Sequence, residues 1–129
     1  MKASGSEAVK PAMVFVVDDE PVLLELATLI LKSMGCEVRT FNDPAIALKE
    51  FALALPDLVI TDYAMGRMNG MDLISECHRI NPRQKLLMVS GTVGEHVFAD
   101  ALVRPDRFLT KPYQFNDFAT CVRELLDAK

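Results

Sequence analysis

The chain has 129 residues and a mass of 14.3 kDa, and half of its residues are hydrophobic while a quarter are charged. These values predict one globular domain that folds without a metal or a disulfide. The net charge of −4 argues against direct binding of nucleic acid through clustered cations, and no stretch reaches the roughly 20 apolar residues of a membrane span. No secretory signal is expected, and the scattered cysteines, Cys36, Cys77 and Cys121, fit reduced thiols in a cytoplasmic protein.

Residues 1–11 are small and polar, so we expect a mobile tail or a linker remnant there, followed by one domain over residues 12–129. Beyond this tail, short apolar runs alternate with segments of helical periodicity. Such short runs are typical of strands that are buried on both faces of a parallel sheet. The expected strands are Met13–Val17, Glu37–Phe41, Leu58–Thr61, Leu86–Ser90 and Arg107–Thr110.

Five helices are expected to follow these strands. Asp43 and Pro44 start the second helix, since a capping carboxylate precedes a proline at the first helical position. Gly35 is expected to end the first helix and Asn81-Pro82 the third. The expected helical ranges are 22–34, 44–55, 73–80, Glu95–Leu102 and Phe115–Asp127. The side chains expected to face inward from the first two helices are Leu23, Leu26, Ala27, Ile30, Met34, Ala47, Phe51 and Leu55.

Strict alternation of strand and helix predicts a doubly wound α/β fold of five βα units, with helices on both faces of a parallel sheet. Ligands bind such sheets outside the carboxyl ends of the strands. Asp18 and Asp19 follow the first expected strand, while Asp62, Ser90 and Lys111 lie at the ends of the third, fourth and fifth. Neighbouring carboxylates repel one another unless cations share the site, and Lys111 and Mg²⁺ are the candidate cations. A carboxylate beside Mg²⁺ and lysine can attack a phosphoryl group and become an aspartyl phosphate.

Four motifs lie at these strand ends, namely VVDDE, LVITDYAMGRMNGMDL, MVSG and FLTKPY. Together they resemble the receiver domain of two-component response regulators, chemotaxis-regulator-like, over residues 13–127. The resemblance implies a flavodoxin-like three-layer sandwich whose five-stranded parallel sheet has the order 2-1-3-4-5. It leaves open whether the domain is free-standing or excised from a hybrid histidine kinase.

The resemblance also implies roles for individual residues. Asp62 would be the phosphoacceptor and Lys111 the partner of the phosphoryl group. Ser90 would be the switch hydroxyl and Phe108 the switch aromatic residue, although Phe108 belongs to the strand core in either case. Asp18, Asp19, Asp62 and the backbone carbonyl of Ala64 would bind Mg²⁺ or Mn²⁺. Thr92 would flank the phosphoryl site, and the Lys111–Pro112 peptide bond would be cis.

The expected function is to take a phosphoryl group from a sensor histidine kinase or a histidine phosphotransfer protein, and to release it slowly. The chain would not otherwise act as an enzyme. A downstream protein would read the face formed by residues 95–102, 107–110 and 115–127, and the chain would be a monomer or weak dimer. The alternatives are an unphosphorylated receiver-like binding module and, in another class, a Mg²⁺-dependent phosphohydrolase that uses an aspartate nucleophile.

One position departs from the family pattern. Met65 is followed by Gly66, where the family usually has proline. Glycine widens the allowed backbone range, so we expect a more mobile loop after Asp62. The sequence does not predict how this affects the lifetime of the phosphoryl group.

Overall fold

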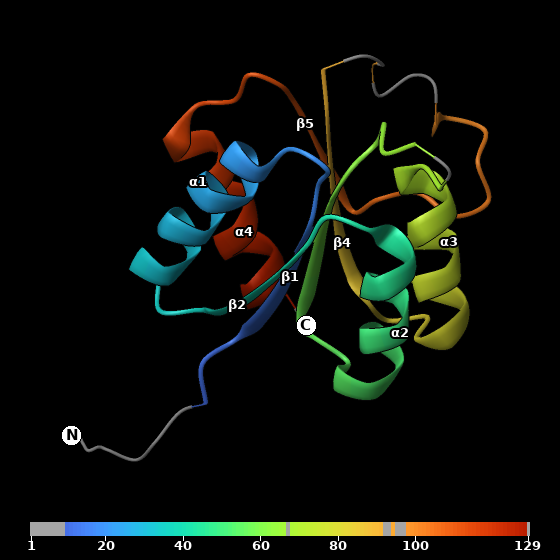
Figure 1. The fold of residues 1–129 in the computed structure, drawn as a ribbon, viewed down its shortest axis with the longest axis horizontal. Coiled ribbons are helices and arrows are strands. Elements are labelled where there is room, and N and C mark those ends of the chain that lie inside the picture. The colour runs from blue at the N-terminus through green and yellow to red at the C-terminus, as the bar shows by residue number, and fades with distance from the viewer. Residues whose placement is uncertain (1–9, 67, 92–93, 95–97, 129) are drawn as a thin grey trace.

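A computed structural model describes residues 10–66, 68–91, 94 and 98–128 of the chain. Within them, five parallel strands form one sheet in the order β2-β1-β3-β4-β5, which confirms the predicted fold and strand order (Figure 1). The strands are β1 (Met13–Val17), β2 (Glu37–Phe41), β3 (Leu58–Asp62), β4 (Lys85–Ser90) and β5 (Arg107–Thr110). Most of the expected tail, residues 1–9, lies outside the described residues.

Helices cover both faces of the sheet. They are α1 (Pro21–Ser33), α2 (Pro44–Ala54), α3 (Gly70–Ile80) and α4 (Phe115–Asp127). Figure 1 shows α1 and α4 on one face and α2 and α3 on the other, which makes three layers. None of the helices in the described part of the chain is long and apolar enough to cross a membrane.

The helix ends follow from local chemistry. The Asp43 side chain accepts a hydrogen bond of 2.9 Å from the Ala45 amide, so that α2 begins where the sequence predicts. At α3, Asn69 and Asp72 form a capping box in which each side chain accepts from the other's backbone amide. Both caps orient loops that lie at the carboxyl edge of the sheet.

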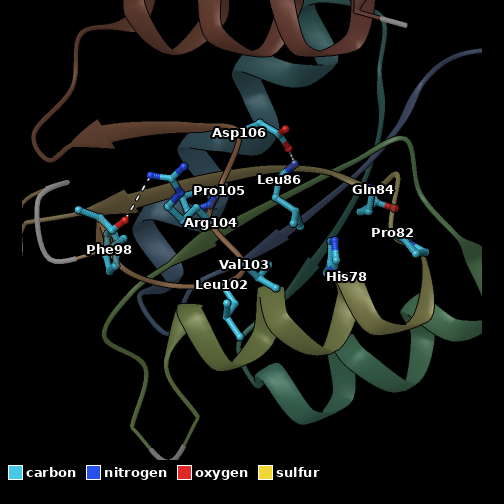
Figure 2. A pocket seen from close by; sticks show the side chains of 11 residues that line it. His78, Pro82, Gln84, Leu86, Phe98, Leu102, Val103, Arg104, Pro105 and Asp106 are labelled. Carbon is cyan, nitrogen blue, oxygen red and sulfur yellow. Dashed lines mark hydrogen bonds between the residues drawn. The ribbon is translucent and has the colours of Figure 1, made fainter.

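The expected helix over Glu95–Leu102 is wrong for the residues that the structure describes. Phe98 is 3₁₀-helical and residues 99–100 form a turn, which is closed by a hydrogen bond of 3.0 Å from the Ala101 amide to the Phe98 carbonyl, while residues 95–97 lie outside the described residues. A helix forms when it buries an apolar face. Here Phe98 is buried but Leu102 is fully exposed, so these two positions do not form a buried apolar face (Figure 2).

The two layers of core follow the alternation of side chains along each strand. In β1, Val14 and Val16 belong to the cluster under α1 and α4, whereas Phe15 and Val17 belong to the cluster under α2 and α3. Each central strand is therefore buried on both faces, as the continuous apolar runs predict.

Two of the expected inward positions on the helices are wrong. Leu26 is 45% exposed, and Leu31 is buried in its place, because α1 contacts the sheet through Ala27, Ile30 and Leu31. Leu55 is exposed because it is the residue after α2 and has a left-handed backbone with φ of 47°. Both differences reflect how each helix is rotated about its axis and where it ends, which periodicity alone does not determine.

Candidate functional site

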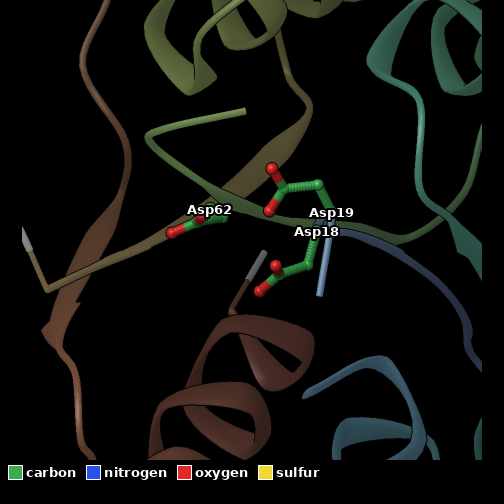
Figure 3. A group of neighbouring side chains, drawn as sticks. All are labelled: Asp18, Asp19 and Asp62. Carbon is green, nitrogen blue, oxygen red and sulfur yellow. The ribbon is translucent and has the colours of Figure 1, made fainter. Parts of the chain in front are cut away.

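Three carboxylates meet at the carboxyl edge of the sheet. Val17 of β1 pairs with Thr61 of β3, so Asp18 and Asp62, the residues that follow, lie side by side. One oxygen from each of Asp18, Asp19 and Asp62 lies within 4.8 Å of the others (Figure 3). Asp18 and Asp62 are buried while Asp19 is exposed, so the cluster opens to solvent on the side of Asp19.

Lys111 supplies the cation of this cluster. Its Nζ lies 3.0 Å from Oδ2 of Asp18 and 3.1 Å from Oδ1 of Asp62. The Lys111 amide donates to the Ser90 carbonyl at 2.9 Å, which fixes the end of β5 against that of β4. The Lys111–Pro112 peptide bond is cis. One ammonium therefore bridges two buried carboxylates that would otherwise repel each other.

Asp62 and Lys111 shift each other's pKa values. Burial raises the pKa of the Asp62 carboxyl above its usual range, with the Asp18 charge adding to the rise, although the hydrogen bond and the charge of Lys111 act in the opposite direction. For Lys111, burial alone would lower the pKa, but the hydrogen bonds and charges of Asp18 and Asp62 outweigh it and hold the pKa above its usual range. The ammonium form of Lys111 is thus favoured more than in water, while the ionised form of Asp62 is favoured less than in water.

The remaining predicted site residues surround this centre. Ser90 ends β4 and is buried, and Ala64 lies in the exposed loop just after β3. Phe108 is half-buried in β5, and its ring centroid lies 5.7 Å from that of Phe98. Thr92 lies outside the described residues. The structure thus brings Asp18, Asp19, Asp62 and Lys111 into direct proximity and places Ser90 at the same sheet edge.

Two residues within the quoted motifs, Glu20 and Tyr63, take part in the site although no role was predicted for them. Glu20 extends from an exposed position to within 3.7 Å of Lys111 Nζ, and its amide donates to Oδ1 of Asp18 at 3.0 Å. The ring of Tyr63 lies 5.5 Å from that of Phe98, which joins Tyr63 to Phe108 through one shared aromatic side chain. Only the position of Glu20 and Tyr63 directly after the acidic residues could have pointed to them.

Gly70 supports the backbone of Asp62. The Gly70 amide donates to the Tyr63 carbonyl at 2.7 Å. A Cβ at Gly70 would lie 2.5 Å from the backbone oxygen of Asp62 and 2.7 Å from the sulfur of Met88. The first turn of α3 therefore approaches the end of β3 so closely that no side chain fits between them.

Gly66 adopts a conformation that proline cannot adopt. Its φ is +87°, whereas the proline ring holds φ near −65°. The loop after Asp62 therefore follows a path that depends on glycine, rather than the path that a proline at this position would impose.

The comparisons with known proteins are consistent with this geometry. The family model described as response regulator receiver domain matches residues 14–123. The chain belongs to the response regulator receiver domain family. Such domains are signalling modules of two-component systems rather than enzymes that turn over a separate substrate, and they interact with sensor kinases and downstream effectors.

Curated relatives of this receiver domain are longer proteins. It is 30% identical over 118 residues to "Probable transcriptional regulatory protein TcrX" of Mycobacterium tuberculosis, covering 91% of this chain and 50% of that protein. It is 31% identical over 120 residues to "Sensor kinase CckA" of Brucella abortus, covering 90% of this chain and 13% of that protein. The chain thus spans half or less of the length of these relatives.

Solved structures share the whole fold. A CheY-like receiver domain from Methanospirillum hungatei superposes with a TM-score of 0.85 at 24% identity, over 92% of this chain and 95% of that chain. The response regulator TrrA from Thermotoga maritima, in complex with Mg²⁺ and BeF, gives a TM-score of 0.80 at 28% identity, over 88% of this chain and 98% of that chain.

The acidic cluster has the chemistry of a site for a hard divalent cation. Mg²⁺ binds one or two carboxylates together with several waters. Asp18, Asp19 and Asp62 offer one oxygen each, and these oxygens lie close enough to one another to contact one ion. The exposure of Asp19 leaves room for water on the open side. The donor set therefore fits the Mg²⁺ that receiver domains bind at an acidic pocket.

Proposed function

We propose that this receiver domain accepts a phosphoryl group on Asp62 from a phosphohistidine donor. The observation that supports this most directly is the juxtaposition of Asp62 with two further carboxylates and the Lys111 ammonium at one sheet edge. A buried carboxylate with a lysine 3.1 Å away is placed to act as a nucleophile toward an anionic group whose charge the lysine offsets.

In the proposed step, an oxygen of Asp62 bonds to phosphorus while the P–N bond of the phosphohistidine breaks. The bonding pair leaves with the imidazole nitrogen, which takes up a proton, and Asp62 becomes an acyl phosphate. Lys111 is within reach of the new phosphoryl oxygens because it already contacts Asp62. Slow reaction with water would restore Asp62 and release phosphate, so the chain acts on itself only.

Asp18, Asp19, Asp62 and the Ala64 carbonyl are the proposed ligands of Mg²⁺ or Mn²⁺. The bound ion would supply positive charge that stabilises the oxygens of the transferring group. The chain itself orients one of these ligands through both of its oxygens: Lys111 donates to Oδ2 of Asp18, and the Glu20 amide donates to Oδ1. Asp19, which is exposed, is free of such restraint in the described part of the chain.

The phosphoryl group would alter a second face. Phosphorylation adds about −1.5 to −2 of charge and strong acceptor oxygens, toward which the Ser90 hydroxyl can turn. We propose that Phe108 then moves inward, and that a downstream protein reads the face formed by residues 98–102, β5 and α4. Phe108 contacts Phe98 in this structure, so its movement would change that aromatic contact.

The donor would dock on α1. This helix starts beside the acidic cluster, and it exposes Val22, Leu26 and Leu29, which share one side at intervals of four and three residues. Exposed apolar side chains in one stripe are a feature of protein interaction sites. We further propose a cytoplasmic monomer or weak dimer over residues 12–129, in keeping with three free thiols.

Acetyl phosphate and phosphoramidate with Mg²⁺ test the proposal by intact-mass spectrometry. The chain should gain one phosphoryl group, the Asp62→Asn variant should gain none, and the Asp100→Asn variant, which changes an exposed carboxyl away from the site, should behave like the wild type. Turnover of a phosphomonoester that survives Asp62→Asn but not Asp18→Asn would instead indicate a phosphohydrolase. No phosphoryl gain in the wild type would leave only a binding module.

Docking on α1 is tested by phosphotransfer from an ATP-loaded histidine kinase. Leu29→Arg should slow this transfer but leave the reaction with acetyl phosphate unchanged. Leu53→Arg is the matched control, because Leu53 is also largely exposed but lies on α2. Equal effects of both variants on kinase phosphotransfer would refute docking on α1.

A further inference from the structure

One buried side chain anchors the loop that follows β3. Met65 is 7% exposed, and it is the only buried residue of this loop among those that the structure describes, 63–66 and 68–69. It belongs to the apolar cluster under α2 and α3. Its neighbours Ala64 and Gly66 are exposed. The loop therefore has one apolar anchor, and this anchor comes directly after the proposed carbonyl ligand.

A second contact holds Met65 against the sheet. The Thr61 hydroxyl lies 3.7 Å from Sδ of Met65 and 2.9 Å from the Asp62 carbonyl oxygen. Thr61 is fully buried in β3, so it offers Met65 a fixed partner. Met65 also lines a hollow of about 670 Å³, together with Met68 and residues 42–45. Truncation of Met65 would widen this hollow and leave the loop without its anchor.

The backbone fixes the other side of Ala64. The Tyr63 amide donates to the Val89 carbonyl at 3.1 Å, and the Tyr63 carbonyl accepts from the Gly70 amide at 2.7 Å. Ala64 thus lies between a residue with two backbone hydrogen bonds and a residue with a buried side chain. Because a peptide unit is planar, the Ala64 carbonyl shares its plane with the Met65 amide. Fixing Met65 therefore limits how far this carbonyl can turn.

We propose that Met65 is a positioning residue for the divalent cation, and that its burial holds the Ala64 carbonyl in the orientation that the ion requires. This inference rests on the Mg²⁺ ligands of the proposed function. Gly66, with φ of +87°, restrains the backbone little on the far side of Met65. Mg²⁺ demands a near-ideal octahedral arrangement of oxygens, whereas Ca²⁺ accepts irregular ones. Loss of the anchor should therefore weaken Mg²⁺ binding much more than Ca²⁺ binding.

The test measures metal binding without phosphorylation. Magnesium chloride and calcium chloride are titrated separately into the ¹⁵N-labelled full chain, and Kd is obtained from the amide shifts of Asp19 and Tyr63. Loss of a group that orients a metal ligand weakens binding by about 10–100-fold. Met65→Ala should thus raise the Kd for Mg²⁺ about tenfold and the Kd for Ca²⁺ less than about threefold. Met65→Leu keeps a buried apolar side chain and should stay within about twofold of the wild type for both ions.

Met13→Ala is the matched control, because Met13 packs against the same apolar cluster from the amino end of β1. It should leave both Kd values unchanged. Met65→Val is a smaller truncation that should raise the Kd for Mg²⁺ by an intermediate factor, and it carries the test if circular dichroism shows that the alanine variant is unfolded. An unchanged Kd for Mg²⁺ in the truncated variants, an equal rise for Ca²⁺, or an equal effect of Met13→Ala would overturn the proposal.

Failure of this inference differs from failure of the proposed function. A wild type that acetyl phosphate phosphorylates, together with normal Mg²⁺ binding by Met65→Ala, would overturn only the positioning role. A wild type that binds Mg²⁺ but gains no phosphoryl group would overturn only the phosphoryl transfer. A wild type that does not bind Mg²⁺ would overturn the metal site and the role of Met65 with it.

Discussion

Gly70 is the position at which one added methyl group probes the geometry beneath Asp62. In the Gly70→Ala variant, the new Cβ would lie 2.5 Å from the backbone oxygen of Asp62, where an ordinary contact begins at 3.4 Å. Either α3 or the end of β3 must therefore move by about 0.9 Å. Gly70 does not have a positive φ, so the strain comes from this contact and not from the backbone conformation.

The cost of this change has two opposing parts. Overpacking of a rigid contact costs about 1–3 kcal/mol, while alanine is favoured over glycine inside a helix by up to about 1 kcal/mol. The contact outweighs the helix preference because the facing atom is backbone and cannot rotate away. We expect a net loss of about 1–2 kcal/mol, which for a domain of this size lowers Tm by about 4–8 °C.

The effect on the site is expected to exceed the effect on stability. Displacement of a reacting group by about 1 Å can lower a rate by about 10²-fold, so phosphorylation of Asp62 by acetyl phosphate should slow at least tenfold in fully folded Gly70→Ala. The initial rate by mass spectrometry and Tm by circular dichroism are measured on the same samples.

Gly35→Ala is the matched control for this experiment. Gly35 has a φ of +86° and no atom within 4 Å of its Cβ position, so alanine there adds backbone strain of about 1–2 kcal/mol away from the site. This variant should lose stability with an unchanged phosphorylation rate. Wild-type Tm and rate in Gly70→Ala, or an equal loss of rate in Gly35→Ala, would refute the close-approach argument.

Three further predictions concern charge, metal and thiols. Burial raises the folded-state pKa of Asp62, so the folded chain binds more protons than the unfolded chain. Ionised Asp62 therefore destabilises the fold at neutral pH. This loss of stability fades as pH falls through the raised pKa. In EDTA, Asp62→Asn should therefore melt above the wild type at pH 7.5 with a margin that shrinks toward pH 4.5, and a lower Tm than wild type at pH 7.5 would contradict this. Mg²⁺ at ten times its Kd should stabilise the wild type by about 1.4 kcal/mol, which raises Tm by about 5 °C. Asp19→Asn should reduce this rise in Tm, with little change in the Tm measured in EDTA. An undiminished rise in the variant would exclude Asp19 as a ligand. Burial, and to a smaller extent the Glu76 charge, raises the pKa of Cys77 to about 12. At pH 8, an aromatic disulfide reagent should therefore leave Cys77 unmodified until guanidinium unfolds the chain. Rapid labelling of the native protein would show that Cys77 is not buried in solution.

The strands and most helix ends could be predicted because their signals are local. A continuous apolar run such as Leu58–Thr61 needs burial on both faces, and Asp43-Pro44 caps a helix whatever packs against it. The meeting of Asp18, Asp19 and Asp62 follows from topology, since parallel strands bring their carboxyl ends to one edge.

The features that escaped prediction depend on tertiary packing. Which side of α1 faces the sheet decides that Leu31 rather than Leu26 is buried. The turn that follows Phe98 and the contact of Phe98 with Tyr63 depend on neighbours that are distant in the sequence. The close approach of Gly70 to Asp62 likewise becomes visible only when α3 is placed against β3.

Because all five strands run in the same direction, the sheet has two chemically different edges. Asp62 and Lys111 lie at the carboxyl edge, whereas the amino ends of β4 and β5 lie at the opposite edge, away from the acidic cluster (Figure 1). A phosphoryl donor at the carboxyl edge and a protein bound at the amino edge would not compete for space, so the domain could bridge them in a ternary complex. If both belong to one partner joined by a linker, binding at the amino edge would raise the effective concentration of the donor at Asp62 to the millimolar range.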